Sequence, residues 1–225
     1  MKFLAAAILA TTAATAARAD VVDSFNRANA LTPGDVYTVQ NGNIRIDGNR
    51  AITTNVVSLA TYNNSASDSA AIDVALRGAE SGSYVALSFG FDSSASYFIK
   101  VQDNDGDGFF DRYRFDTGNN DLTGPIQTLN SFQSGSIAVG IVGSVATLTV
   151  TANGGTQTFS YDYGFVTGSA TVGFGLNRFG VADNFSFDGL ANAPVPEPAT
   201  WALMIGGFGL AGAASRSRRR GVVAA

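Results

Sequence analysis

The side chains best suited to chemistry lie in one short acidic segment, residues 103–111. Four aspartates fall within it: Asp103, Asp105, Asp107 and Asp111. Counted from Asp103, they occupy positions 1, 3, 5 and 9 of a calcium-binding loop, with Gly108 at the sharp turn of position 6 and Phe109 offering its carbonyl at position 7. Carboxylate and carbonyl oxygens are hard ligands that suit Ca²⁺. The spacing therefore predicts a calcium site made by these four aspartates and Phe109.

One position of this loop departs from the expected pattern. An EF-hand has a bidentate Glu at position 12, whereas this chain has Arg114, so water or another loop would have to complete the coordination. The segment resembles instead the short DxDxDG repeats of extracellular proteins, set here in a hairpin. The alternative is a solvated hairpin tip in which the Asp-Gly pairs only supply turn geometry. Mutual repulsion among four carboxylates favours the cation.

The elements that must position this loop are β-strands. Between Asp20 and Asn192, short alternating runs rich in Val, Ile, Thr, Phe and Tyr are separated by Gly, Asn, Asp and Ser. This pattern predicts an all-β domain over residues 20–192, an antiparallel two-sheet β-sandwich in which each strand has one apolar face. The predicted strands are Val36–Gln40, Ile44–Asp47, Ala51–Val57, Ala70–Leu76, Tyr84–Phe91, Tyr97–Gln102, Arg112–Phe115, Ile137–Val142, Ala146–Thr151, Thr156–Tyr161, Thr171–Leu176 and Asp183–Phe187.

Both ends of the domain resemble terminal strands of concanavalin A-like, laminin G-like jelly rolls. The opening segment 23–28 reads DSFNRA and is followed by GNIRI at 42–46 and NRA at 49–51, and the closing segment 181–187 reads VADNFSF. The resemblance implies that the first and last strands lie side by side. It also raises the possibility of a polysaccharide hydrolase, because glucanases share this fold.

The composition argues against catalysis. The chain has no Cys and no His, which excludes a thiol nucleophile, a Ser-His-Asp relay and an imidazole base. A glycosidase needs two neighbouring carboxyl groups, and glucanases of this fold carry a Glu-x-Asp-x-x-Glu strand. Here the two glutamates are Glu80, in a Gly-rich loop, and Glu197, near the C-terminus. We therefore expect a protein that is not an enzyme.

The N-terminus has the pattern of a secretory signal peptide. Met1-Lys2 precedes an apolar run over residues 3–17, and small residues flank the end of the segment at Ala17 and Ala19. This predicts a signal helix in residues 1–19, export by the Sec machinery and a mature start at Asp20.

Residues 20–198 carry 8 Lys plus Arg and 18 Asp plus Glu, a net charge of 8 − 18 = −10. Such an acidic domain excludes nucleic acid as a partner.

The C-terminal segment, residues 193–225, divides into a proline-rich stretch, an apolar run at 199–214 and a basic tail at 215–225. The apolar run is long enough to enter the bilayer but short for a permanent transmembrane helix. The basic residues after it should stay in the cytoplasm. They are Arg216, Arg218, Arg219 and Arg220.

This order of parts resembles the PEP-CTERM sorting signal. The residues that carry the resemblance are Val195, Pro196, Glu197, Pro198, Ala199 and Trp201. The resemblance implies that an exosortase processes the chain near this motif, after transient anchoring in the inner membrane. The alternative is a plain C-terminal membrane anchor with stop-transfer charges.

Together these features predict a non-catalytic exported protein of the cell surface or extracellular matrix. Its jelly roll is expected to bind or associate with extracellular polysaccharide, and the aromatic candidates for sugar contact are Tyr62, Tyr84, Tyr97 and Tyr113. Asn63-Asn64 and Asn119-Asn120 are loop candidates for polar contacts, although they also suit turns. A structural or adhesive protein without a defined glycan ligand is the alternative, and a hydrolase of the same fold is the second.

Overall fold

The computed structural model describes the chain from residue 18 to residue 190, apart from residue 55 and the segments 92–95, 118–123 and 167–169. Residues 1–17, which make up most of the signal helix expected in residues 1–19, lie outside the described residues. The sorting segment 193–225, with its apolar helix, lies wholly outside them. Within the described part of the chain, no helix is long and apolar enough to cross a bilayer.

The described residues form fifteen β-strands. In chain order they are β1 (Arg18–Asp23), β2 (Tyr37–Asn41), β3 (Ile44–Asp47), β4 (Arg50–Thr53), β5 (Ser58–Tyr62), β6 (Ser69–Leu76), β7 (Ser83–Phe89), β8 (Tyr97–Asp103), β9 (Phe110–Thr117), β10 (Gln127–Phe132), β11 (Ser134–Val142), β12 (Val145–Ala152), β13 (Gly155–Asp162), β14 (Val172–Asn177) and β15 (Gly180–Leu190).

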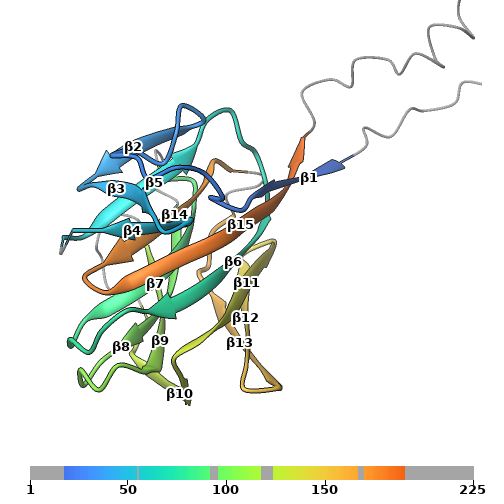
Figure 1. Ribbon diagram of the computed structural model, residues 1–225. Helices are drawn as coiled ribbons and strands as arrows, with labels where there is room; N and C mark the ends of the chain where they lie inside the picture. Colours follow the sequence, from blue (N-terminus) through green and yellow to red (C-terminus); the bar gives the residue numbers. More distant parts are fainter. Residues whose placement is uncertain (1–17, 55, 92–95, 118–123, 167–169, 191–225) are drawn as a thin grey trace, which may run out of the picture. The chain divides into compact units, whose positions relative to one another are not determined.

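These strands make two antiparallel sheets packed face to face (Figure 1). Sheet A has the order β13-β12-β11-β6-β15-β4-β3, with β1 also paired to β15, and sheet B has the order β10-β9-β8-β7-β14-β5-β2. The predicted all-β, two-sheet antiparallel sandwich is confirmed. Both sheets contribute buried apolar side chains to one continuous core within residues 18–190, so this unit carries its own core and is expected to fold independently.

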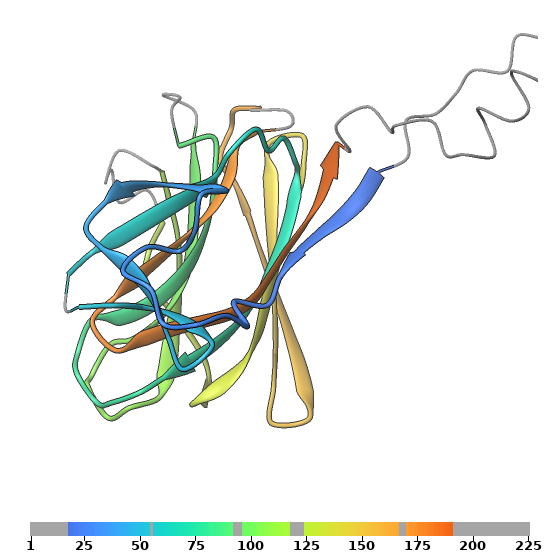
Figure 2. The same cartoon turned by 45° about the horizontal axis from the view of Figure 1, so that its top comes forward.

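The terminal strands lie side by side, as the jelly-roll resemblance implied. β1 pairs with the second half of β15, from Arg18 opposite Leu190 to Asp23 opposite Phe185. The described chain therefore enters and leaves the sandwich at the same place (Figure 2). The first strand ends at Asp23, so the DSFNRA segment begins where this strand stops rather than forming it.

Three observed strands, β1, β5 and β10, were not among the predicted ones. The prediction of one strand over Ala51–Val57 was wrong in its second half, because β4 ends at Thr53 and the chain turns back into β5. Hydroxyl contacts hold this turn: Thr53 Oγ1 lies 2.7 Å from Ser58 Oγ and donates to the Val56 carbonyl at 3.0 Å. β10 was missed because a bulge interrupts its pairing with β9, so it lacks a two-residue period.

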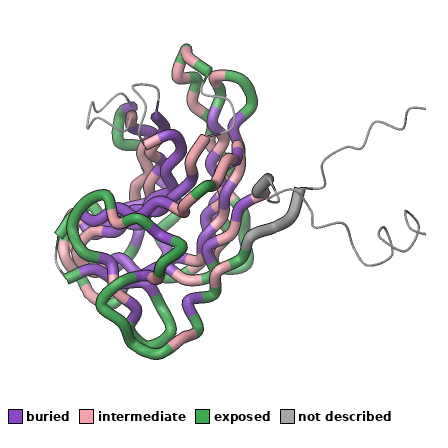
Figure 3. Tube along the Cα trace, turned by 90° about the horizontal axis from the view of Figure 1, so that it is seen from above, coloured by how far each residue is buried: buried purple, intermediate pink, exposed green. Residues whose placement is uncertain are grey.

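Buried residues lie mainly in the strands (Figure 3), although β13 contains none. In β6 buried and partly exposed residues alternate along the whole strand, and in β12 every second residue is buried up to Val150, which is typical of a strand with one solvated face. β7 differs, because all seven of its residues are buried. Residues on both faces of this strand are thus withdrawn from water, so neighbouring side chains also cover β7 on the outer face of sheet B.

The DSFNRA segment forms a clasp at the start of the sandwich. Phe25 is fully buried in a left-handed backbone conformation (φ 49°), and its ring meets Phe174 edge to face at 5.5 Å. Asp23 fixes this conformation by accepting a hydrogen bond from the Phe25 N–H at 2.8 Å. Arg27 donates to both carboxylate oxygens of Asp23, at 2.7 and 3.0 Å, and its guanidinium lies over the Phe25 ring.

The clasp predicts a pH-dependent contribution to stability. Burial alone would raise the pKa of Asp23, but the hydrogen bonds from Arg27 and from the Phe25 N–H outweigh it and lower the pKa. A lowered folded pKa means that the contribution is complete above the unfolded value of about 3.9 and is lost as the pH falls through the folded value. We expect Asp23→Asn to lower the free energy of unfolding at pH 7 by about 1–3 kcal/mol.

Urea unfolding at pH 7 and at pH 3 measures this effect. The difference between the wild type and Asp23→Asn should shrink at the lower pH, whereas the exposed control Asp35→Asn should change little at either. An equal difference at both pH values would show that the carboxylate charge of Asp23 does not hold the clasp.

Candidate functional site

The acidic loop brings three of its four aspartates together. Asp103 is the last residue of β8 and is fully buried, Asp111 is the second residue of β9 and is 7% exposed, and Asp105 lies between them on the exposed turn. One carboxylate oxygen from each lies within 4.8 Å of the other two. Such spacing suits a shared cation.

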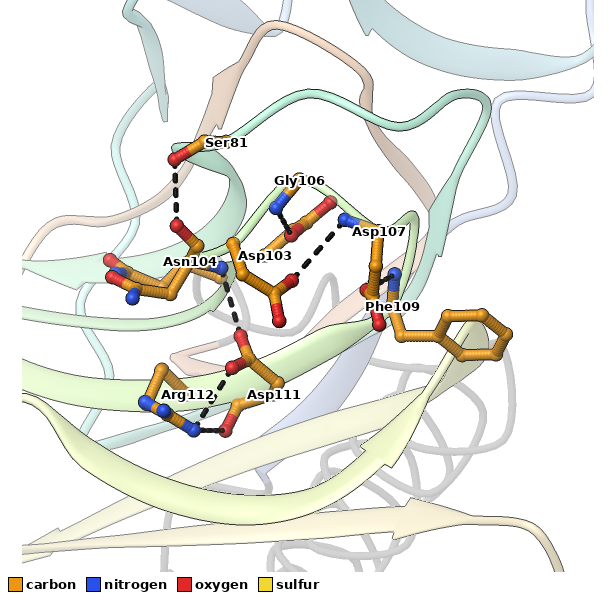
Figure 4. A network of polar contacts seen from close by, with 10 residues as sticks. Ser81, Asp103, Asn104, Gly106, Asp107, Phe109, Asp111 and Arg112 are labelled. Atoms are coloured by element: carbon orange, nitrogen blue, oxygen red, sulfur yellow. Dashed lines mark hydrogen bonds and ion pairs between the residues drawn. The ribbon is translucent and has the colours of Figure 1, made fainter.

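The backbone of the loop orients these carboxylates (Figure 4). Asp103 accepts the Gly106 N–H on Oδ1 at 2.6 Å and the Gly108 N–H on Oδ2 at 3.0 Å. Asp111 Oδ1 accepts the Asn104 N–H at 2.8 Å. Each of these oxygens still has a second lone pair, so the loop can hold the carboxylates in place and leave them able to bind a cation.

Asp107 and Phe109 lie differently. Asp107 is exposed, and its Oδ1 accepts the Phe109 N–H at 2.9 Å, so its side chain closes a local turn and is not part of the three-aspartate group. The Phe109 side chain is 42% exposed. Its carbonyl as a metal ligand stays a prediction, and so does Asp107.

The charge of the loop fits a divalent cation. Arg112 Nη1 lies 2.9 Å from Asp111 Oδ2 and offsets one of the three grouped carboxylates, which leaves a formal charge of about −2. Arg114, the residue at loop position 12, points its charge elsewhere: its Nε lies 2.7 Å from Asp116. The residues present therefore fit a hard divalent ion held by three carboxylates, with no fourth protein charge from position 12.

The loop rests on the connection between β6 and β7. Ser81 Oγ donates to the Asn104 carbonyl at 2.7 Å (Figure 4), and the Gly82 N–H donates to the Asp103 carbonyl at 2.7 Å. Gly106 has φ +87°, and a Cβ there would lie 2.8 Å from the Ser81 backbone nitrogen. Only glycine fits this approach without displacement of one of the two loops.

A second candidate site was not predicted from the sequence. It is a hollow of about 470 Å³ on sheet B, which we call the sheet B groove. Its walls come from strands far apart in the sequence. The residues used below are Asn41 of β2, Leu59 of β5, Tyr84 of β7, Phe98 and Lys100 of β8, and Asp116 of β9.

The alternation of β8 places the groove on the outer face of the sheet. Tyr97, Ile99 and Val101 are fully buried in the core between the sheets, so Phe98 and Lys100 point the opposite way. Phe98 meets Tyr84 edge to face, with 6.0 Å between ring centroids. A Cβ at Gly175 of β14 would lie 2.9 Å from Phe98 Cζ, so this glycine lets the ring lie across the sheet.

A buried carboxylate lies in the groove. The Asp116 side chain is 4% exposed, and its Oδ2 lies 3.0 Å from Lys100 Nζ. Its Oδ1 lies 2.7 Å from Arg114 Nε, but that N–H is donated to the Gly124 carbonyl at 2.9 Å. Among the described residues, Oδ1 therefore has an ion-pair contact but accepts no hydrogen bond. A buried acceptor without a donor is costly to keep, so this oxygen is suited to a donor from a ligand.

Tyr84 and Lys100 complete the polar side of the groove. Lys100 Nζ lies 5.1 Å from the centre of the Tyr84 ring, close enough for a cation–π contact. Burial and then the nearby Asp116 carboxylate raise the pKa of Tyr84, so its hydroxyl stays protonated and can donate a hydrogen bond.

The other sugar-contact candidates have structural roles. Tyr97 is fully buried, Tyr113 stacks on Phe159 at 4.0 Å, and Tyr62 packs edge to face on Tyr37 at 5.2 Å. The Asn63 side chain bonds Thr38 and the Asp35 carbonyl, as a turn residue does. Asn119-Asn120 lie outside the described residues.

The alternation in residues 97–101 and 112–116 could have placed Phe98, Lys100, Arg114 and Asp116 on one face, but no short motif marks the groove. Apart from Tyr84, which the sequence offers as a candidate for sugar contact, this pairing of two strands is the only signal for the groove. Asn41 and Leu59, on the other wall, carry no signal at all.

Comparison with known proteins settles the nature of the C-terminal segment. Residues 194–220 match the model of the PEP-CTERM protein-sorting motif. The chain carries a PEP-CTERM sorting motif. This match includes most of the residues predicted for the signal and all four arginines of the basic tail, and the motif implies processing by an exosortase. No curated protein matches the chain.

The sandwich is similar in fold to carbohydrate-active proteins of the concanavalin A-like type. Lectin II from Ulex europaeus has a TM-score of 0.53 at 8% identity, over 76% of this chain and 97% of the lectin. The Crh5 transglycosylase in its apo form has a TM-score of 0.54 at 11% identity, over 79% and 86%. The Bacillus licheniformis β-glucanase has a TM-score of 0.52 at 8% identity, over 75% and 97%. Identities this low establish the fold alone.

The contact between the two loops predicts the effect of a single added methyl group. Gly106→Ala should lower the free energy of unfolding by about 1–3 kcal/mol, because the new Cβ meets the Ser81 backbone and the positive φ is strained. Gly154→Ala is the matched control, since Gly154 also has a positive φ (+74°) but nothing within 4 Å. Thermal unfolding of both variants separates the two causes: equal losses would mean that the loops do not touch in solution.

Proposed function

We propose that this chain is a non-catalytic exported surface protein that an exosortase processes and whose sandwich binds extracellular polysaccharide in the sheet B groove. The observation that carries the proposal is the grouping of Tyr84 and Phe98 with the buried Asp116 and with Lys100 in one hollow. Sugar sites typically combine an aromatic surface for the C–H face of the ring with a few fixed polar groups for the hydroxyls.

Each polar group of the groove has a part in this proposal. Asp116 Oδ1 accepts a hydrogen bond from a sugar hydroxyl, which supplies the donor that the protein itself does not offer it. Lys100 Nζ and the protonated Tyr84 hydroxyl donate to ring or hydroxyl oxygens. Because these groups are fixed by the sheet, they are ordered before the ligand arrives, which lowers the entropy cost of binding.

Binding is favoured over hydrolysis by the number of carboxylates. Of the described residues that line the groove, Asp116 is the one acid, whereas the usual hydrolytic mechanisms use two carboxyl groups about 5–9.5 Å apart. Glu80, on the β6–β7 connection, is paired with Arg178 at 3.3 Å.

The sorting motif supplies the destination. Proteins with a PEP-CTERM motif are exported and sorted to the cell surface, and we place this chain there or in the extracellular matrix after transient anchoring in the inner membrane. The mature start at Asp20 and cleavage near Pro196 complete this proposal.

The test of the function is binding of the exported protein to glycans. On a glycan array, and on exopolysaccharide of the source organism, we expect saturable binding that Phe98→Ala weakens about tenfold or more, because the variant removes an aromatic contact surface. Phe159→Ala on β13 of sheet A removes a similarly half-buried aromatic away from the groove and should bind like the wild type. No binding to any glycan would leave a structural or adhesive role, and release of reducing sugar would favour the hydrolase.

We also propose that the acidic loop binds Ca²⁺, with Asp103, Asp105 and Asp111 as ligands. Three carboxylates within 4.8 Å of one another and a formal charge of about −2 support a hard divalent ion. Mg²⁺ is less suited, because it demands a near-ideal octahedral site and dehydrates reluctantly. With no bidentate Glu at position 12, we expect a Kd on the order of 10⁻⁴ to 10⁻³ M.

Calcium should then stabilise the folded protein. At about ten times the Kd the expected gain in the free energy of unfolding is about 1.4 kcal/mol, which calorimetry in EGTA and in CaCl₂ can measure. Asp105→Asn should abolish the gain, whereas Asp107→Asn, which removes the same charge outside the three-aspartate group, should retain most of it. A melting temperature that is unaffected by calcium, with no heat of binding, would reduce the loop to a turn.

A further inference from the structure

Among the described residues, positive charge exceeds negative charge around Asp116, the acid that lines the sheet B groove. Lys100 and Arg114 both contact Asp116, at 3.0 and 2.7 Å, and two cations against one carboxylate leave an excess of one positive charge. The side chains of Lys100 and Arg114 are only 13% and 12% exposed, so water compensates this excess poorly.

This local charge is opposite in sign to that of the domain. Residues 20–198 have a net charge of −10, yet three of their eight cationic residues, Lys100, Arg112 and Arg114, lie on two adjacent strands. Lys100 lies directly opposite Arg114 in the pairing of β8 with β9, and Gln102 lies opposite Arg112. Arg112 is paired with Asp111, so within the described part of the chain the uncompensated charge is that of the Lys100–Arg114 pair.

We propose that the sheet B groove is specific for an acidic saccharide, whose carboxylate group binds at Lys100 while its hydroxyls bind at Asp116. This inference rests on the proposed glycan binding and adds the class of sugar. A ligand carboxylate at Lys100 supplies the negative charge that the three side chains lack, and a hydroxyl on the same ring supplies the donor that Asp116 Oδ1 lacks. A uronic acid unit carries both groups on one ring.

The aromatic residues of the groove fit the same unit. Tyr84 and Phe98 meet edge to face beside Lys100, so a sugar ring lying against them brings its substituents to the Lys100 and Asp116 end. Lys100 Nζ has three N–H donors. Among the described residues it pairs only with Asp116 and contacts the Tyr84 ring, which leaves a donor for the ligand.

The acidic surface of the domain does not oppose this assignment. Exposed charges are screened over roughly 8 Å at physiological ionic strength, whereas a charge pair formed inside a groove is screened much less. The negative surface therefore slows the approach of a polyanion but does not cancel the contact once it is made. Selection for an acid thus depends on the groove residues and not on net charge.

The test compares matched sugars on the purified full-length protein. Short oligomers of galacturonate, glucuronate and mannuronate are titrated beside their carboxyl-reduced forms, in which –CH₂OH replaces –COO⁻. We expect at least one acid to bind about tenfold to a hundredfold more tightly than its reduced form, the ratio expected for one charge-assisted hydrogen bond. Raising NaCl from about 0.05 to about 0.5 M should lower the affinity for the acid and leave the affinity for the reduced sugar nearly unchanged.

Variants assign the selectivity to Lys100. Lys100→Met should lower the affinity for the acid by about tenfold or more, and should lower the affinity for the reduced sugar much less. Lys100→Arg should keep the preference for the acid. Arg50→Met, on β4 of sheet A, should behave as the wild type. Melting curves establish that each variant is folded. If Lys100→Met does not fold, the specificity is decided by the wild type alone, from the ratio of its affinities for the acid and the reduced sugar and from the salt dependence of that ratio.

Equal affinity for acid and reduced forms, or a preference for the reduced form, would overturn the acidic specificity and leave glycan binding standing. Binding to neither form, together with none on the glycan array, would overturn both. Binding of neutral array glycans alone would overturn only the specificity.

Discussion

The pairing of β8 with β9 is the constraint on which both candidate sites depend. Its register sets Phe98 opposite Asp116 and Lys100 opposite Arg114 on the outer face, while Ile99 and Val101 fill the core. The turn that joins the two strands is the acidic loop itself, with Asp103 and Asp111 as its flanking carboxylates. A slip by one residue would bury Lys100 between the sheets and disperse both sites, so the core that fixes the fold also fixes the chemistry.

The acidic loop joins several connections at one end of the sandwich. It rests on the β6–β7 connection through Ser81 and Gly82. That connection in turn contacts the β14–β15 turn, where Asn177 donates to the Gly82 carbonyl at 2.8 Å and Arg178 pairs with Glu80. Since β6 and β15 belong to sheet A and the other strands to sheet B, a cation in the loop would hold together connections of both sheets.

The sequence was informative where local chemistry decides the structure. Period-two patterns predicted twelve of the strands and the antiparallel sandwich, and the spacing of Asp103, Asp105 and Asp111 predicted residues that lie together. It was uninformative where distant strands meet. β5 is buried along both faces and shows no alternation, and the groove joins Leu59 to Asp116 across a sheet order that no local pattern encodes. Spacing alone cannot distinguish a carboxylate that binds a cation from one that closes a turn, so Asp107 as a metal ligand stays a prediction.

The antiparallel pairing of the two terminal strands has a mechanical consequence. β15 is eleven residues long, lies inside sheet A between β6 on one side and β4 and β1 on the other, and ends at Leu190, from which the chain continues toward the sorting motif. Tension applied to the protein through that end acts along the strand. It loads the hydrogen bonds to β6 and β1 together, in shear, and does not open them one at a time. Strands loaded in this way resist being pulled apart, although no disulfide reinforces them.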